Sequence, residues 1–224
     1  MTIMKDSGML VISGGQTGVD LAGLRAAQVM GFRTGGTAPF KWRTQAGPQP
    51  SLLFFFLRES TVSNYVDRTK ENVVNADATL LIYVHGDSAG TKLTRKLCKS
   101  HDRPTLEVDL KQDVNADSII KWIKTQAAIS TTLYGSFTLN IAGNSSSSAP
   151  GIFQTSFSLL VKVFKELASG PTDQDDADRA QLFAQVSNPQ MAAQLNDRFD
   201  HIPQLDFRNR YNGLIIDGAA HVSS

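Results

Sequence analysis

Strand-like and helix-like segments alternate along the chain from residue 9 to about residue 168. The runs MLVIS (9–13) and ATLLIYV (78–84) are apolar throughout, which is typical of strands buried on both faces of a parallel sheet. Stretches with helical spacing of apolar residues lie between such runs, for example NADSIIKWIKTQAAI (115–129). This alternation indicates βαβ units, so we predict an α/β protein with a mostly parallel sheet.

The sequence changes in character after residue 168. Residues 173–201 are polar and helix-prone, and aspartates gather at their start, where negative charge favours a helix N-terminus. We therefore expect an α/β domain over residues 1–168. Residues 169–224 are expected to form a C-terminal extension that is mostly helical or partly flexible.

Composition excludes several kinds of partner and site. The chain has 22 basic and 21 acidic side chains, so no overall charge draws it to nucleic acid or to an anionic membrane. Its single cysteine, Cys98, excludes an intrachain disulfide, and its histidines show no metal-binding spacing. MTIMKDSGML lacks the apolar core of a signal peptide. We expect a cytoplasmic protein without a resident metal.

Three local expectations concern the first half of the chain. Asp20 is expected to cap a helix that runs to about Met30. The apolar segment LLFFFLRES (52–60) is expected to form a buried strand. Residues 32–50 are rich in glycine and proline, so they are expected to contain little regular structure.

Three of the expected strands run into loops of glycine and hydroxyl-bearing residues. Because the carboxyl ends of parallel strands share one edge of a sheet, these loops should meet there, each at a helix N-terminus. Backbone N–H groups, hydroxyls and helix dipoles together suit a phosphate, a phosphorylated small molecule or an oxyanion. Singly, each loop is equally well explained as a tight turn that needs glycine. The loops are Gly14-Gly15-Gln16-Thr17-Gly18, Gly86-Asp87-Ser88-Ala89-Gly90-Thr91 and Gly143-Asn144-Ser145-Ser146.

Basic side chains near these loops are candidates for anion contact. A guanidinium can bind two oxygens of a phosphate or molybdate at once. Arg68 and Arg43 rank above Lys92 and Lys41, because the motifs in which they stand are the more specific. The alternative for each is an ordinary solvated charge. The first loop matches neither the phosphate loop of nucleoside triphosphatases nor the usual dinucleotide-binding glycine pattern.

Five motifs together resemble one known family. They are ISGGQTGVD, GGTAP followed by WRTQAGPQP, SNYVDRTKENVVNADATLLIY, GTKLT, and LNIAG followed by SAPGI. This set resembles the molybdenum cofactor carrier proteins, a branch of the Rossmann-like LOG (SLOG) superfamily, over residues 9–168. Two departures are Pro39-Phe40-Lys41-Trp42, where related carriers tend to have Lys-Gly before Trp-Arg, and the apolar run after GPQP.

The resemblance implies a Rossmann-like three-layer α/β/α fold and a homo-oligomer, often a tetramer. It also implies binding of the molybdenum cofactor, a phosphorylated pterin that carries molybdenum, or of a related anion such as molybdate or phosphate. The cargo would be protected before its insertion into molybdoenzymes, so those enzymes or their insertion machinery are expected partners. The residues expected to contact the ligand are Gly14, Gly15, Gln16, Thr17, Gly18, Asp20, Arg43, Arg68, Gly86, Asp87, Ser88, Gly90, Thr91, Lys92, Gly143, Asn144 and Ser145.

Phosphoribohydrolases of the same superfamily carry the pattern P-G-G-x-G-T-x-x-E, whose glutamate performs acid–base chemistry. Thr94 stands at that position here, and a threonine cannot act as a carboxylate base. We therefore predict a binding protein with no catalytic residue. The alternative is a nucleotide-binding or nucleotide-processing member in which Asp20 or Asp87 replaces the glutamate. A third possibility is an interaction module that works through residues 173–224.

Overall fold

A parallel five-stranded sheet forms the centre of the described part of the chain, which is residues 8–169 of a computed structural model. The expected C-terminal extension, apart from Ser169, lies outside these residues. Every neighbouring pair of strands in the sheet is parallel, as predicted. The order is β2-β1-β9-β7-β8, with bounds β1 Met9–Ile12, β2 Arg33–Gly35, β7 Ala78–Tyr83, β8 Thr105–Asp109 and β9 Phe137–Gly143.

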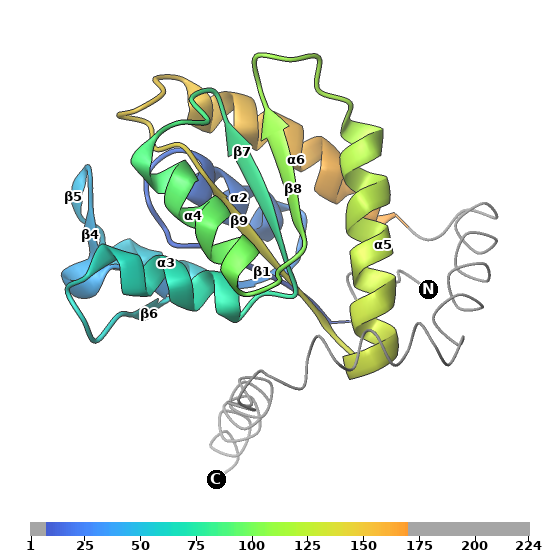
Figure 1. Ribbon diagram of the computed structural model, residues 1–224, viewed down its shortest axis with the longest axis horizontal. Helices are drawn as coiled ribbons and strands as arrows, with labels where there is room; N and C mark the ends of the chain where they lie inside the picture. Colours follow the sequence, from blue (N-terminus) through green and yellow to red (C-terminus); the bar gives the residue numbers. More distant parts are fainter. Residues whose placement is uncertain (1–7, 170–224) are drawn as a thin grey trace, which may run out of the picture. The chain divides into compact units, whose positions relative to one another are not determined.

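Helices cover both faces of the sheet (Figure 1). Helices α2, α5 and α6 pack on one face, and α3 and α4 pack on the other. The predicted Rossmann-like three-layer α/β/α arrangement is therefore confirmed. The helix bounds are α2 Val19–Val29, α3 Tyr65–Val74, α4 Ala89–Ser100, α5 Ala116–Tyr134 and α6 Ile152–Ala168.

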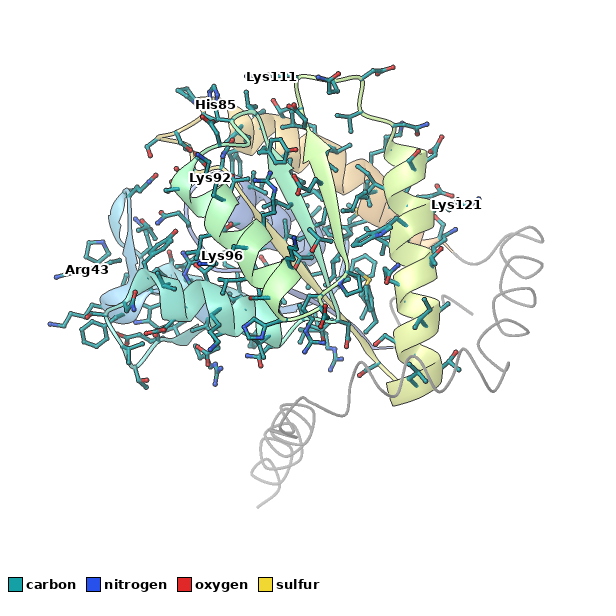
Figure 2. All side chains as sticks on the ribbon, viewed as in Figure 1. Arg43, His85, Lys92, Lys96, Lys111 and Lys121 are labelled. Carbon is teal, nitrogen blue, oxygen red and sulfur yellow. The ribbon has the colours of Figure 1, made fainter. Side chains whose placement is uncertain are left out.

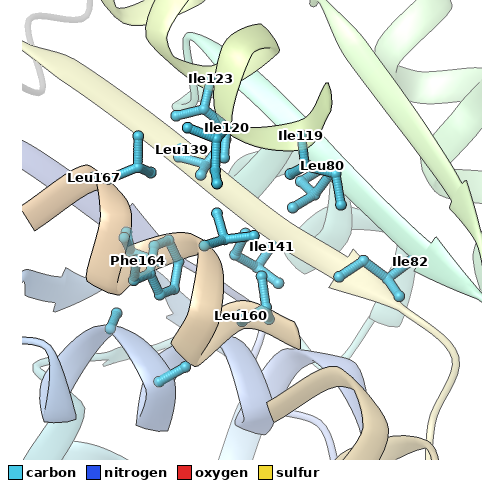
Figure 3. Packing of buried hydrophobic residues seen from close by; sticks show 14 of the residues in the cluster. Leu80, Ile82, Ile119, Ile120, Ile123, Leu139, Ile141, Leu160, Phe164 and Leu167 are labelled. Carbon is cyan, nitrogen blue, oxygen red and sulfur yellow. The ribbon is translucent and has the colours of Figure 1, made fainter. Parts of the chain in front are cut away.

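The main core lies between the sheet and the helices α2, α5 and α6 (Figure 3). Leu139 and Ile141 of β9 are fully buried there, together with Leu160 and Phe164 of α6. The strands are apolar without alternation because helices exclude water from both of their faces. The core thus fixes the central strands, and with them the loops at their carboxyl ends.

Residues 32–60 contain more regular structure than the glycine and proline content predicts. Beyond β2, short pairings form because backbone groups near the sheet need partners even where glycine and proline prevent long strands. They are the parallel pair β3 (Thr37–Ala38) with β6 (Arg58–Glu59) and the antiparallel pair β4 (Arg43–Thr44) with β5 (Gly47–Pro48). A single 3-10 turn, η1 (Phe40–Trp42), precedes β4.

The predicted strand over residues 52–60 is wrong for most of its length. The chain forms a 3-10 helix there, η2 (Pro50–Phe55), and only the short β6 follows. Side chains three residues apart share a face of a 3-10 helix, so Leu52 and Phe55 are both buried against Leu24 of α2. The intervening side chains, and Phe56 after the helix, are exposed. A continuous apolar run fits a buried strand or such a turn equally well.

Two neighbouring phenylalanines provide a test of this local structure. Phe55→Ala is expected to lower the free energy of unfolding by about 3 kcal/mol, because it removes a buried ring, and Phe55 is only 8% exposed. Phe54→Ala is expected to change it by less than about 0.5 kcal/mol, since Phe54 is 76% exposed. Urea unfolding of both variants measures the difference. Equal losses would show that both rings are buried, as in a strand covered on both faces.

Asp20 does not cap α2, contrary to the prediction. The helix begins at Val19 after Gly18, and no side chain caps it. The carboxylate of Asp20 instead accepts a hydrogen bond from the backbone N–H of Gln16, at 3.3 Å. Asp20 therefore belongs to the first glycine loop rather than to the helix end.

The described residues also set limits on membrane and metal sites. None of their helices has the length and apolar character to cross a membrane. Within residues 8–169, no three His, Cys, Asp or Glu side chains are grouped so as to hold a metal ion.

Candidate anion-binding site

The strand order reverses where the three loops emerge. From β1 the chain continues to β2 on one side, whereas β7 leads to β8 on the other, and β9 lies between them. Such a reversal opens a crevice outside the carboxyl ends of the strands, where ligands bind in α/β sheets. The loops after β1, β7 and β9 all lie at this edge, as predicted.

Backbone hydrogen bonds join the first loop to the third. The N–H of Val19 donates to Asn144 O at 3.1 Å, and the N–H of Ser146 donates to Thr17 O at 3.3 Å. Gly18 makes this approach possible, because it has φ 95° and a Cβ there would lie 2.4 Å from Asn144 O. Only glycine combines that backbone angle with so close a contact.

Asn144 joins the third loop to the second. Its side chain is 2% exposed, and both of its polar atoms are bonded within the protein. Oδ1 accepts from the N–H groups of Val84 and His85, both at 2.9 Å. Nδ2 donates to His85 O at 3.1 Å and to the hydroxyls of Ser88 and Thr91 at 3.0 Å. One amide thus holds the second and third loops together.

A short hairpin covers the first and third loops. Gln45, at the turn between β4 and β5, donates its N–H to Gln16 Oε1 at 2.8 Å. Its own Oε1 accepts a hydrogen bond from the hydroxyl of Ser147. Gln45 was missed as a site residue, although it belongs to the WRTQ motif.

Asp20 and Arg68 form a buried ion pair beside Gly14. Arg68 Nη1 lies 3.4 Å from Asp20 Oδ2, and the two residues are 4% and 6% exposed. A Cβ on Gly14 would lie 1.4 Å from Arg68 Nη1, so the guanidinium lies directly against the backbone of the first loop. Three residues predicted from two separate motifs are therefore in contact.

Arg68 retains unused hydrogen-bonding capacity. Its Nε and Nη2 are buried and have no hydrogen-bond partner within residues 8–169. These two nitrogens lie on the same edge of the guanidinium plane and can bind two oxygens of one anion. The Tyr65 ring packs on the group, with its centroid 4.3 Å from Arg68 Cζ. A buried donor without a partner is costly, so this edge is suited to receive an oxyanion.

Burial raises the pKa of Asp20 above its usual value. The charge of Arg68 and the hydrogen bond from Gln16 N oppose this effect but do not cancel it. Arg68 therefore stabilises the charged form of Asp20 only in part, in agreement with the single long contact between the two side chains. An anion bound to the free edge would place further negative charge near Asp20 and raise its pKa more.

The raised pKa of Asp20 gives a pH dependence with a defined sign. The folded state binds the proton more tightly than the unfolded state, in which the pKa is near 3.8. This contribution to stability is complete below pH 3.8 and is lost as the pH rises through the folded pKa. We expect the free energy of unfolding of the wild type minus that of Asp20→Asn to fall with rising pH. Chemical unfolding across that pH range measures this difference. A difference that rises with pH would show that the charge of Arg68 lowers the pKa of Asp20 more than burial raises it.

Gly14→Ala is expected to displace Arg68, because the added methyl would occupy the place of Nη1. We expect a loss of about 3 kcal/mol in the free energy of unfolding, since a close-packed buried group must move. Gly90→Ala is the matched control, because a Cβ there meets nothing within 4 Å. In a helix that change stabilises by up to about 1 kcal/mol. Thermal unfolding compares the two, and equal effects would contradict the packing of Arg68 on Gly14.

The other predicted residues lie in the second and third loops, on α4 and in the hairpin. Arg43 is exposed at the start of the hairpin, and Lys92 is exposed on α4 (Figure 2). The side chains of Asp87 and Lys92 make no hydrogen bond among residues 8–169, while Ser88 caps α4. The Ser145 hydroxyl lies 3.2 Å from that of Ser147. These residues stay predictions as ligand contacts.

Thr94 faces its own helix rather than the joined loops. Its hydroxyl donates to Gly90 O at 3.0 Å, and the residue is 5% exposed. The position at which the phosphoribohydrolases carry their glutamate therefore has no acid–base group.

Comparison with known proteins agrees with the fold and the motifs. Residues 11–164 match the family described as "Circularly permutated YpsA SLOG family". The chain belongs to this family. Within the SLOG superfamily, the resemblance drawn from the five motifs is thereby confirmed. In this SLOG chain, the glycine loops and Arg68 all fall inside the matched residues.

A solved structure supports the same relationship. The SLOG chain resembles the crystal structure of a "Putative molybdenum carrier protein" from Syntrophus aciditrophicus SB, with 30% sequence identity and a TM-score of 0.60. The similarity covers 70% of this chain and 95% of that one. None of the curated proteins compared matches the chain.

Proposed function

We propose that this protein binds an anionic small molecule at the three joined loops, and that its cargo is the molybdenum cofactor. The observation that carries this proposal is Arg68, a buried cation whose Nε and Nη2 have no partner among the described residues. A terminal phosphate, or a molybdenum-bound oxygen pair, would satisfy both donors. The solved relative described as a molybdenum carrier supports the choice of cargo.

Holding the cargo, rather than cleaving it, is the proposed activity. Thr94 carries no acid–base group, and Asp20 is buried against Arg68 with a raised pKa. A protonated or Arg-paired carboxyl is poorly suited to activate water. In this proposal, the protein is a cytoplasmic homo-oligomer that passes its cargo to molybdoenzymes or their insertion machinery. Residues 1–168 form the binding domain and residues 169–224 an extension.

Co-purification of the cofactor tests the proposal. The full chain is produced in cells that make molybdenum cofactor, and the pterin released after oxidation is measured by fluorescence. Arg68→Lys is expected to retain about tenfold less pterin than the wild type, because lysine keeps the charge but lacks the two-donor edge.

Arg33→Lys is the matched control. Arg33 donates to Gly8 O at 3.0 Å at the start of β2, at the opposite edge of the sheet, so it should retain pterin like the wild type. Equal pterin in all three proteins would contradict the assigned site. A wild type that retains no pterin but binds adenine nucleotides tightly would instead favour the nucleotide-binding alternative.

A further inference from the structure

A cavity lies beside the Arg68 site and is not explained by the anion alone. Its volume is about 150 Å³, and it opens between η1 and the N-terminus of α3. The lining residues are Pro39, Phe40, Arg43, Ser63, Asn64 and Tyr65. Residues from two distant motifs, WRTQ and YVDRT, therefore meet at one hollow.

Tyr65 connects this cavity to the buried arginine. Its ring lines the cavity and also packs on Arg68, at 4.3 Å from Cζ. Tyr65 is 44% exposed, so it forms a wall between solvent and the guanidinium. Tyr65 is therefore the residue that the cavity and the proposed anion site share.

The cavity has the chemistry of a site for one planar ring. Two aromatic side chains and a proline provide apolar surface, while Arg43 and Ser63 provide polar groups at its margin. Pockets that bind organic ligands combine these features. An engineered protein cavity of about 150 Å³ holds one benzene molecule, so the space fits a single six-membered ring.

We propose that this cavity, with Phe40 and Tyr65 as its aromatic walls, binds the ring nearest the anionic end of the ligand. The inference rests on the proposed function, because it takes Arg68 as the anion site. It goes further by assigning the residues that hold the ring of the ligand, Phe40 and Tyr65. Phe40 then selects for the ring, and Arg68 selects for the charge.

Simple phosphate esters separate the two contributions. Inorganic phosphate and methyl phosphate probe the anion site, whereas benzyl phosphate and 2-phenylethyl phosphate add a ring at two distances. Calorimetry with the full chain is expected to show at least one aromatic ester binding about tenfold more tightly than methyl phosphate, as an added aromatic contact gives.

Variants at Phe40 show whether the ring is bound in this cavity. Phe40→Leu keeps an apolar side chain of similar bulk, so it should remove the tenfold advantage while leaving the affinity for inorganic phosphate unchanged. Tyr65→Phe keeps the aromatic wall and should preserve the advantage. Arg68→Lys should weaken all four probes together.

The outcomes distinguish this inference from the proposed function. Aromatic esters that bind no better than methyl phosphate, or an advantage that survives in Phe40→Leu, would overturn the ring site alone. A Phe40→Leu variant that loses inorganic phosphate equally would show a structural role for Phe40 and would also overturn it. A wild type that binds none of the four probes would overturn both the anion site and the ring site.

Discussion

Asn144→Ala is expected to lower the free energy of unfolding by about 4 kcal/mol, one of the largest effects of any single substitution in this chain. Removal of the amide leaves the N–H groups of Val84 and His85 without their acceptor. It also takes one hydrogen bond away from His85 O and from the hydroxyls of Ser88 and Thr91, although each of these oxygens keeps another donor in the second loop. Each buried polar group left unsatisfied costs about 1–3 kcal/mol, although water that enters the gap recovers part of this.

Two further variants separate this role from a general effect of losing an asparagine. Asn115→Ala removes the side chain that caps α5, and such a loss costs about 1 kcal/mol. Asn144→Asp keeps the shape but replaces the Nδ2 donor with an oxygen that faces His85 O, so it should be nearly as damaging as alanine. Urea unfolding measures all three. An Asn144→Ala variant no less stable than Asn115→Ala would contradict the view that Asn144 joins the second and third loops.

Arg68→Met is expected to cost about 4 kcal/mol, because it leaves Asp20 buried without its cation. The loss should grow as the pH rises and Asp20 ionises, since burial already raises the pKa of that carboxyl. Chemical unfolding at a low and a neutral pH measures both effects.

A double variant checks that the cost arises from the unpaired charge. Asp20→Leu combined with Arg68→Met removes both charges, and apolar replacement of a buried ion pair is often neutral or stabilising. We expect the double variant to be more stable than Arg68→Met alone. A double variant that is less stable than the single one would show that Arg68 acts through packing on Tyr65 and Gly14 rather than through Asp20.

The sequence predicts the layers of this fold better than its strand order. Apolar runs followed by amphipathic helices indicate a parallel sheet, because only a sheet covered on both faces tolerates such strands. The place of β9 between β1 and β7 joins residues more than 50 positions apart, and no local pattern encodes it. The run at 52–57 is ambiguous for a different reason. A strand buries every second residue and a 3-10 helix every third, and an unbroken apolar stretch fits both patterns.

The candidate site was predictable in its parts but not in its connections. Glycine loops and the YVDRT motif indicate Gly14 and Arg68 separately, yet only the fold brings them into contact. Asn144 is polar and lies in a loop, so the sequence predicts that it contacts the ligand. In the structure its side-chain oxygen and nitrogen are both hydrogen-bonded within the protein. Asp20 has the position of a cap and instead pairs with a residue 48 positions away.

The side-chain resonance of Arg68 tests the central claim most directly. In a spectrum of ¹⁵N-labelled full-length protein, the Nε–Hε signal of Arg68 is identified by its disappearance in Arg68→Lys. On addition of methyl phosphate, this signal is expected to move strongly downfield and saturate, as a new charge-assisted hydrogen bond forms at Nε. A signal that stays in place while methyl phosphate binds elsewhere would contradict the account.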